Sequence, residues 1–128
     1  MAVSFIRKLG QAALPVRDVS RAEAFYRDVL GLFHLWSNQH MAFFDCGGTR
    51  LMLEVPEKPE FDHPGSVLYF DVDSLDEAVA EYTAKGVTFV EPPHHIGDLG
   101  NVSVWVAFFR DSEGNLLALQ EERPRQTP

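Results

Sequence analysis

The sequence has one cysteine, few basic residues and no long apolar run. Because Cys46 has no second cysteine to pair with, an internal disulfide is excluded, and 128 residues are enough to bury a core without one. The first eight residues also lack the apolar stretch of a signal peptide. We therefore expect a protein that folds alone in the reducing cytoplasm.

Basic residues are too few to give the surface a positive field. The chain has 11 Lys and Arg against 19 Asp and Glu, which gives a net charge of -8. Nucleic-acid phosphates and anionic membranes bind proteins largely through basic surfaces. We therefore expect no nucleic-acid partner and no membrane partner, whereas cationic partners stay compatible with the charge.

An internal repeat, about half a chain apart, organises the sequence. The run Val16-Arg17-Asp18-Val19, followed by Ala22, Tyr26 and Gly31, matches the run Val72-Asp73-Ser74-Leu75, followed by Ala78, Tyr82 and Gly86. Asp18 or Ser20 can cap the first predicted helix, Ser74 can cap the second, and a glycine ends each. The chain is therefore predicted to be a duplicated module.

Alternating and β-rich runs surround both predicted helices. We expect strands over residues 9–16, 41–45, 49–55, 67–72, 87–90, 102–109 and 116–120. The fold class is therefore α+β, with module one at about 7–56, a proline-containing linker at about 57–65, module two at about 66–121 and a disordered tail at about 122–128. Residues 97–101 are expected to form a polar loop that can move over a pocket, and Pro92 to His95 are expected to lie in the loop that precedes the strand at 102–109.

Strand alternation predicts which side chains share a face. Leu51, Leu53, Leu117 and Leu119 should pack on the helices. The repeat makes Gln11 equivalent to Val67 and Met52 equivalent to Ala118, all on the opposite side. These four residues are expected to converge near a local two-fold axis, where a ligand would sit.

The runs 14–18 (LPVRD), 25–32 (FYRDVLGL) and 109–115 (FRDSEGN) give the chain a family resemblance. Their order resembles the glyoxalase, bleomycin-resistance and extradiol-dioxygenase superfamily, also called the vicinal oxygen chelate superfamily. The resemblance covers nearly the whole chain. It implies one domain over residues 1–128, with two tandem βαβββ modules forming a cupped, mixed sheet and helices outside, and it implies a homodimer.

The resemblance also points to a departure in the usual metal site. Metal enzymes of the superfamily carry a ligand, usually His or Glu, at positions that match Gln11, Met52, Val67 and Ala118. These residues offer an amide, a thioether and two hydrocarbons, whereas a divalent cation needs about three or four oxygen, imidazole or thiolate donors. We expect no metal and no other cofactor, so the glyoxalase and dioxygenase mechanisms do not transfer.

Two residues are candidates for acid or base chemistry. His94 follows two prolines, and the resemblance implies a Pro-His step in metal-poor members, so His94 is the first candidate. The alternative is that His94 and His95 are simply solvated in a loop. Glu54 lies on the same face as Met52, where an apolar surrounding would raise its pKa, and its alternative is a solvated strand end.

The remaining site candidates are ligand contacts. These predicted ligand-binding residues are Gln11, Met52, Val67, Tyr69, Trp105, Ala118 and Gln120. Gln11 needs a polar partner if it is buried. That partner can be a ligand, and Gln120 or a water molecule would serve equally well. Trp105 can stack on an aromatic ligand or belong to the core.

The function predicted is metal-independent binding of a small organic molecule with an apolar body, with its conversion left open. One alternative is a metal-dependent lyase or dioxygenase with displaced ligands, drawn from His94, His95 and Glu54. The other is an antibiotic-sequestering resistance protein, for which the acidic surface favours a cationic aromatic drug.

Overall fold

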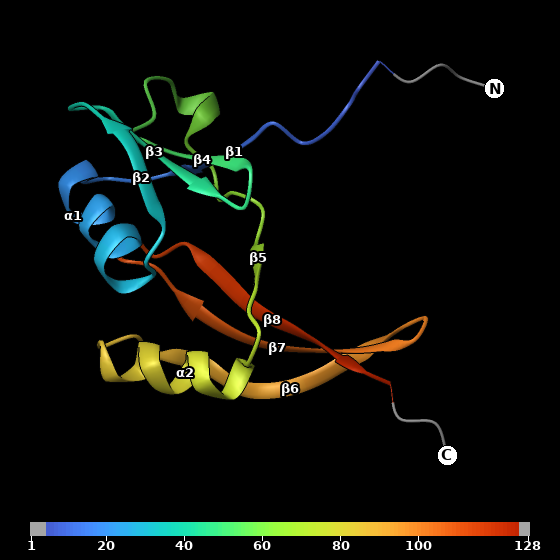
Figure 1. The fold of residues 1–128 in the computed structure, drawn as a ribbon. Helices are drawn as coiled ribbons and strands as arrows, with labels where there is room; N and C mark the ends of the chain where they lie inside the picture. Colours follow the sequence, from blue (N-terminus) through green and yellow to red (C-terminus); the bar gives the residue numbers. More distant parts are fainter. Residues whose placement is uncertain (1–4, 126–128) are drawn as a thin grey trace. The chain divides into compact units, whose positions relative to one another are not determined.

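A computed structural model describes residues 5–125 of the chain. It divides into two compact units, Met1–Gly65 and Ser66–Pro128. Each unit has one four-stranded mixed sheet and a helix that packs against its own sheet (Figure 1). The predicted α+β class is therefore confirmed, as is the predicted βαβββ order of each module.

Unit 1 contains the first sheet, with strand order β1-β4-β3-β2. Its elements are β1 (Gln11–Pro15), α1 (Val19–Ala24), a π-helical turn (Phe25–Val29), β2 (Phe33–Ser37), β3 (Met41–Cys46) and β4 (Thr49–Glu54). β1 runs parallel to β4, and the other neighbours are antiparallel. Asp18 caps α1 by accepting a hydrogen bond from the Arg21 N–H at 3.0 Å.

The core of unit 1 lies between its sheet and its helix. Leu14, Leu51 and Leu53 are almost fully buried, and they alternate with more exposed neighbours as the strand period requires. Tyr26, from the π-helical turn, packs with its ring centroid 6.0 Å from that of Phe44. This packing leaves the other face of the sheet free of the helix.

Unit 2 repeats the arrangement, with strand order β5-β8-β7-β6. Its elements are β5 (Leu68–Asp71), α2 (Leu75–Ala84), β6 (Phe89–Leu99), β7 (Val102–Arg110) and β8 (Leu116–Pro124). Ser74 caps α2 by accepting from the Glu77 N–H at 3.3 Å. Leu117 and Leu119 are buried on the helix side, as predicted.

Two parts of the sequence prediction are wrong. β2 was not predicted, and residues 92–99 are part of strand β6 instead of a loop. β6 tolerates Pro92 and Pro93 because it is an edge strand and because register shifts interrupt its pairing with β7 on both sides of Glu91. Only the turn at Gly100 and Asn101 remains of the expected loop.

The linker has some regular structure, and the tail starts later than predicted. The linker contains one 3-10 turn, η2 (Pro59–Phe61). Residues 122–124 belong to β8, where Glu122 and Pro124 pair with Val104 and Val102, so the tail does not begin at 122. Residues 126–128 lie outside the described part. No helix among the described residues is long and apolar enough to cross a membrane.

Candidate functional site

Several predicted site residues of unit 1 share the sheet face that points away from α1. Gln11 lies opposite Arg50 in the β1–β4 ladder, and Ala13 lies opposite Met52. Glu54 follows at the end of β4, on the same face as Met52. The alternation predicted from the sequence therefore places Gln11, Met52 and Glu54 correctly.

Gln11 has its hydrogen-bond partners within unit 1. Its Oε1 accepts from Arg50 Nε at 2.6 Å, and its Nε2 donates to Met52 Sδ at 3.7 Å. Arg50 in turn lies 5.6 Å from the centre of the Phe43 ring. Gln11 is thus held by its neighbours, and the expected partner Gln120 is bonded elsewhere.

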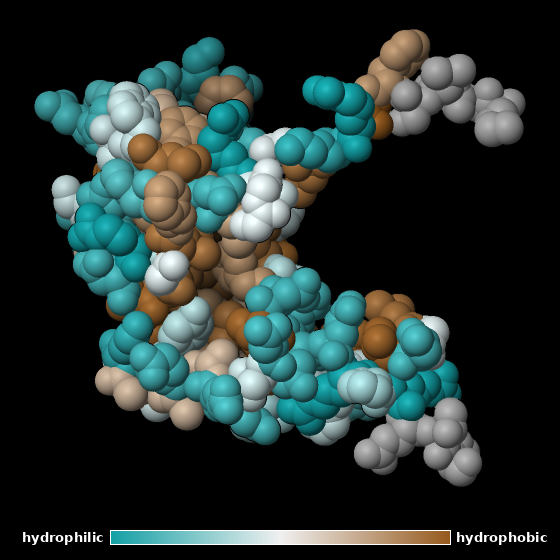
Figure 2. Space-filling model, in the orientation of Figure 1, coloured by the Kyte–Doolittle hydropathy of each residue, from teal (hydrophilic) through white to brown (hydrophobic). Residues whose placement is uncertain are grey.

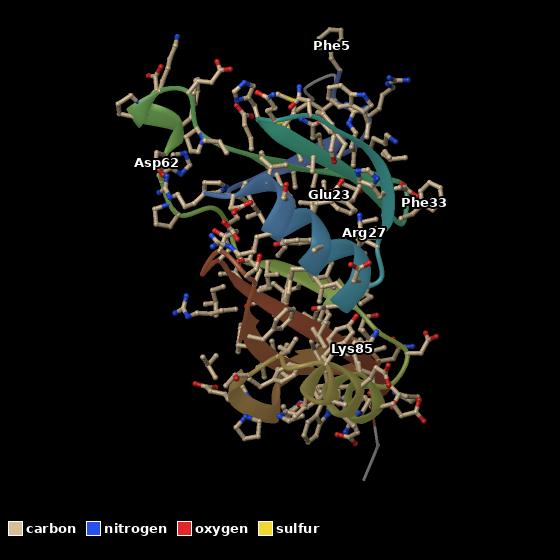
Figure 3. The ribbon with its side chains drawn as sticks, turned by 90° about the vertical axis from the view of Figure 1, so that its left-hand side faces the viewer. Phe5, Glu23, Arg27, Phe33, Asp62 and Lys85 are labelled. Carbon is tan, nitrogen blue, oxygen red and sulfur yellow. The ribbon has the colours of Figure 1, made fainter. Side chains whose placement is uncertain are left out.

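Met52 and Glu54 line a cavity of about 370 Å³ within unit 1. Its other walls include Ala13 and Pro15 from β1, with Phe61 and His63 from the linker. Asp62 of the linker (labelled in Figure 3) forms an ion pair at 2.6 Å with Arg17, near the start of α1. The linker therefore does more than connect the modules, because it forms one side of this cavity.

Among residues 5–125, Glu54 is the one carboxylate that lines this cavity. Its backbone oxygen accepts from the Val16 N–H, but its carboxylate has no hydrogen bond or ion pair with any residue from 5 to 125. Arg50, a cation on the same face of β4, donates to Gln11 instead. The cavity thus combines mainly apolar walls with one half-buried, unpaired acidic group.

In unit 2, Ala118 lies between two aromatic residues. It pairs with Tyr69 of β5 on one side and with Phe108 of β7 on the other. The two rings meet edge to face with centroids 5.8 Å apart, and Ala118 is fully buried. The methyl group of Ala118 is therefore covered in this structure, and its contact with a ligand stays a prediction.

Tyr69 and Gln120 remain accessible on the same face as this aromatic pair. Tyr69 is 45% exposed, and Gln120 Nε2 donates to Asp71 Oδ1 at 2.6 Å. Val67, half-buried, precedes β5 and is not part of the ladder. Their contact with a ligand stays a prediction.

His94 and His95 point to opposite faces of β6. His94 pairs with Val106 and lies 6.2 Å from the Phe108 ring, whereas His95 pairs with Trp105. The Pro92 carbonyl, 3.0 Å from His94 Nδ1, can only accept, so Nδ1 carries the proton. His94 Nε2, which lies 3.7 Å from Glu91 Oε2, then carries no proton and can accept one, as a general base requires.

Trp105 is on the other face of the sheet from Ala118 and Gln120. It pairs with Glu121, and the Arg123 guanidinium lies 4.4 Å from the centre of its ring. Within unit 2, the structure therefore does not bring Trp105 together with Ala118 and Gln120. Strand alternation along residues 102–109 predicts this separation, since Trp105 and Val106 must point to opposite faces of the sheet.

The donor chemistry does not fit a metal site. No group of three or more His, Cys, Asp and Glu in residues 5–125 is arranged to hold a metal ion. The alternative ligand set of His94, His95 and Glu54 does not fit either, because His94 and His95 point to opposite faces of β6. The Gln11 oxygen, the best donor of the four usual positions, is already bonded to Arg50.

The predicted ligand contacts leave out several residues of these faces. Asp71 and Phe108 lie on the same face as Gln120, and strand alternation is enough to add them. Phe61 and His63 gave no signal, because an irregular segment has no period from which to infer its facing.

Three comparisons relate the chain to known proteins. The family model "Glyoxalase/Bleomycin resistance protein/Dioxygenase superfamily" matches residues 8–119. "Uncharacterized protein YraH" from Bacillus subtilis (strain 168) is 32% identical over 126 residues, which is 88% of this chain and 96% of that protein. Together these matches cover nearly all of both modules.

Two solved structures share the fold. A superfamily member from Sphaerobacter thermophilus is 26% identical with a TM-score of 0.77, covering 93% of this chain and all of that one. Lactoylglutathione lyase from Agrobacterium tumefaciens is 25% identical with a TM-score of 0.71, covering 92% of this chain and 96% of that one.

Proposed function

Since this chain belongs to the Glyoxalase/Bleomycin resistance protein/Dioxygenase superfamily, we propose that it binds a small organic molecule, without a divalent metal, in the cavity of unit 1. The single observation that carries this proposal is the unpaired Glu54 carboxylate in a mainly apolar cavity of about 370 Å³. A volume of this order is typical of small-ligand pockets, whose walls are mostly apolar with a few polar groups.

The cavity favours a ligand with an apolar body and at least one hydrogen-bond donor. Ala13, Pro15, Met52 and Phe61 provide apolar contact. A carboxylate is only an acceptor, so Glu54 selects a hydroxyl, an amide N–H or an amine on the ligand. A protonated amine would gain most, because charge-assisted hydrogen bonds are about twice as strong as neutral ones.

The absence of a metal is proposed from the bonding of Gln11. A cation at this position would need the Gln11 oxygen, which accepts a 2.6 Å hydrogen bond from a positively charged guanidinium. Arg50 would then also repel the cation. The metal chemistry of lyases and dioxygenases is therefore not proposed for this chain.

A ligand screen tests the proposal directly. A panel of aromatic and aliphatic alcohols, amines and carboxylates, with Mn²⁺, Ni²⁺ and Zn²⁺ added separately, should contain organic molecules that raise the melting temperature, while the metals leave it unchanged. Glu54→Gln should weaken the binding of amines most. Glu57→Gln, which changes an exposed linker residue, should leave their binding unchanged. A hit that Glu54→Gln leaves unaffected, or stabilisation by metal alone, would refute the proposal.

Conversion of the ligand is the second candidate function. Two groups are equipped for proton transfer: the unpaired Glu54 carboxylate, and the imidazole of His94, whose Nε2 is unprotonated and lies 3.7 Å from Glu91 Oε2. Mass spectrometry of a hit after long incubation separates conversion from storage. If a product forms, Glu54→Gln and His94→Gln identify the base, and an unchanged ligand supports sequestration.

A homodimer is also part of the proposal. Edge strand β2 exposes Phe33 (71%), Leu35 (47%) and Trp36 (53%), a concentration of apolar side chains that a second copy would cover. Light scattering should give twice the 14.4 kDa chain mass, and Phe33→Lys should shift it toward the monomer.

A further inference from the structure

The second sheet has an outer end that its helix does not cover. The first N–H of α2, at Leu75, donates to Glu121 Oε1 at 2.7 Å, which places the start of the helix beside the middle of β8. The β6–β7 hairpin continues well beyond α2 (Figure 1). The surface of this protruding part is mostly hydrophilic, with a small apolar cluster near the turn (Figure 2).

A cavity of about 740 Å³ lies at this end of unit 2. Two cross-strand rows on one face of the sheet form its floor. One row joins Asp98, Ser103 and Arg123, and the other joins His95, Trp105 and Glu121. Arg125 follows Arg123 by two residues and also lines the cavity.

Internal bonds fix the polar groups of this cavity. Asp98 Oδ1 accepts from Ser103 Oγ at 2.7 Å and from His95 Nε2 at 3.0 Å, and its other oxygen lies 3.6 Å from Arg125 Nε. These partners lower the pKa of Asp98, with the Ser103 and His95 hydrogen bonds as the main causes. Among residues 5–125, the carboxylates of these two rows are Asp98 and Glu121, and both already have partners.

The side chain of Arg123, like that of Asp98, is fixed by neighbouring residues. Its guanidinium stacks on Trp105 at 4.4 Å, and its Nε donates to Glu121 Oε2 at 2.8 Å. This arrangement restricts the side chain before any ligand arrives, which reduces the entropy lost on binding. Arginine in this state is suited to recognise an anionic group in a fixed orientation.

Several donors remain available after these bonds are made. Arg123 Nη1, Arg125 Nη2 and the Trp105 indole N–H have no partner in residues 5–125. No free carboxylate lines the cavity to use them. Arg123, Arg125 and Trp105, which carry these donors, thus line one cavity in a chain whose net charge is -8.

We infer that this cavity is a second binding site, for a small molecule that carries an oxyanion, either a phosphate or a carboxylate group. Guanidinium groups match the geometry of both anions, and paired arginines bind them through charge-assisted hydrogen bonds. The site is separate from the unit 1 cavity, because no residue lines both. An experiment that refutes ligand binding in the unit 1 cavity therefore does not refute oxyanion binding here, and the reverse also holds.

Nuclear magnetic resonance of the Trp105 indole N–H tests this inference on the full chain. Trp36→Phe, at a half-exposed position, leaves a single indole signal, which belongs to Trp105. Titration of this variant with inorganic phosphate, with phenyl phosphate or with acetate should shift that signal saturably. Sodium chloride at matched ionic strength should not, since chloride lacks the oxygen geometry.

Substitution of the arginines makes the test specific. In the Trp36→Phe background, Arg125→Gln should weaken binding about tenfold, equivalent to one charge-assisted hydrogen bond. Arg110→Gln makes the same charge change at the other end of β7 and should leave binding unchanged. A shift with phosphate alone, or with acetate alone, supports the site and identifies its preferred anion. No saturable shift with any of the three anions, an equal shift with chloride, or equal losses in both arginine variants would overturn the inference.

Discussion

The side chain of Gln11 accepts a 2.6 Å hydrogen bond from Arg50 across the parallel strands β1 and β4. The contact joins two residues that are 39 positions apart, so it links the first strand of unit 1 to its last. It also leaves Gln11 Nε2 directed at Met52 Sδ. A residue at a position that binds metal in related enzymes is here part of the scaffold.

A double-mutant cycle should detect this contact. Gln11→Ala and Arg50→Ala should each lower the free energy of unfolding, and the double variant should lose less than their sum. The expected coupling is about 0.5 to 1.5 kcal/mol, as for a typical hydrogen bond. Urea unfolding measures it, with Arg7→Ala paired with Gln11→Ala as the control cycle. Strict additivity would show that the contact contributes nothing.

Gly65 closes the cavity of unit 1 against Leu14. A Cβ added at Gly65 would lie 2.8 Å from Leu14 Cδ2, and Leu14 is almost fully buried. We expect Gly65→Ala to lower the free energy of unfolding by roughly 1 to 3 kcal/mol through overpacking. Gly10→Ala is the matched control, since nothing lies within 4 Å of its added Cβ.

A second variant separates crowding from a backbone effect. Leu14→Val shortens the side chain that Gly65→Ala would strike, so the double variant should lose less stability than the sum of the singles. If the two losses simply add, the close approach of Gly65 to Leu14 is not the cause.

Alternation within the repeat made much of unit 1 predictable. Leu14, Leu51 and Leu53 had to share one face, which left Met52 and Glu54 on the other, and the structure agrees. The same rule separates Trp105 from Gln120. Strand alternation therefore predicts the faces of regular strands. Trp105 was grouped with Gln120 only because alternation was not applied to residues 102–109.

Features that depend on tertiary structure could not be predicted in this way. Pro92 and Pro93 indicated a loop, but bulges on an edge strand accommodate them, because an edge residue need not donate to a neighbour. The cavity wall from Phe61 and His63 depends on how the linker folds back on β1. No periodic pattern encodes such a contact.

The methyl group of Ala118 fills the space beneath the Tyr69 and Phe108 rings. Ala118→Leu should force the rings apart and lower the free energy of unfolding by roughly 1 to 3 kcal/mol. Ala80→Leu, on the exposed side of α2, adds the same volume and should have little effect. Equal unfolding midpoints for the two variants in urea would show that the ring pair does not confine residue 118.

The Cys46 thiol should react slowly in the folded protein. Burial, and then the neighbouring Asp45 carboxylate, raise the pKa of Cys46, so less thiolate is present near neutral pH. Alkylation by iodoacetamide at pH 7 should therefore be slower in the native protein than in urea, and Asp45→Asn should modestly accelerate it. Equal native and unfolded rates would contradict this.

Glu121 should make the stability of the protein depend on pH in the acid range. The Leu75 backbone N–H and then Arg123 lower the pKa of this carboxyl group below its ordinary value of 4.5. A carboxyl group whose pKa falls on folding stabilises the native state above its unfolded pKa, and this contribution is lost as the pH drops below about 4.5 toward the folded pKa.

Glu121→Gln should consequently lower the free energy of unfolding more at pH 7 than at pH 3, and the wild-type advantage should shrink between these values. Urea unfolding across this range measures the difference. Glu122→Gln removes the same charge from the exposed neighbouring residue and serves as the control. An advantage of wild type over Glu121→Gln that is constant with pH would mean that the helix-capping and arginine contacts of Glu121 do not favour its charged form, and the arrangement of α2 on β8 would then rest on packing alone.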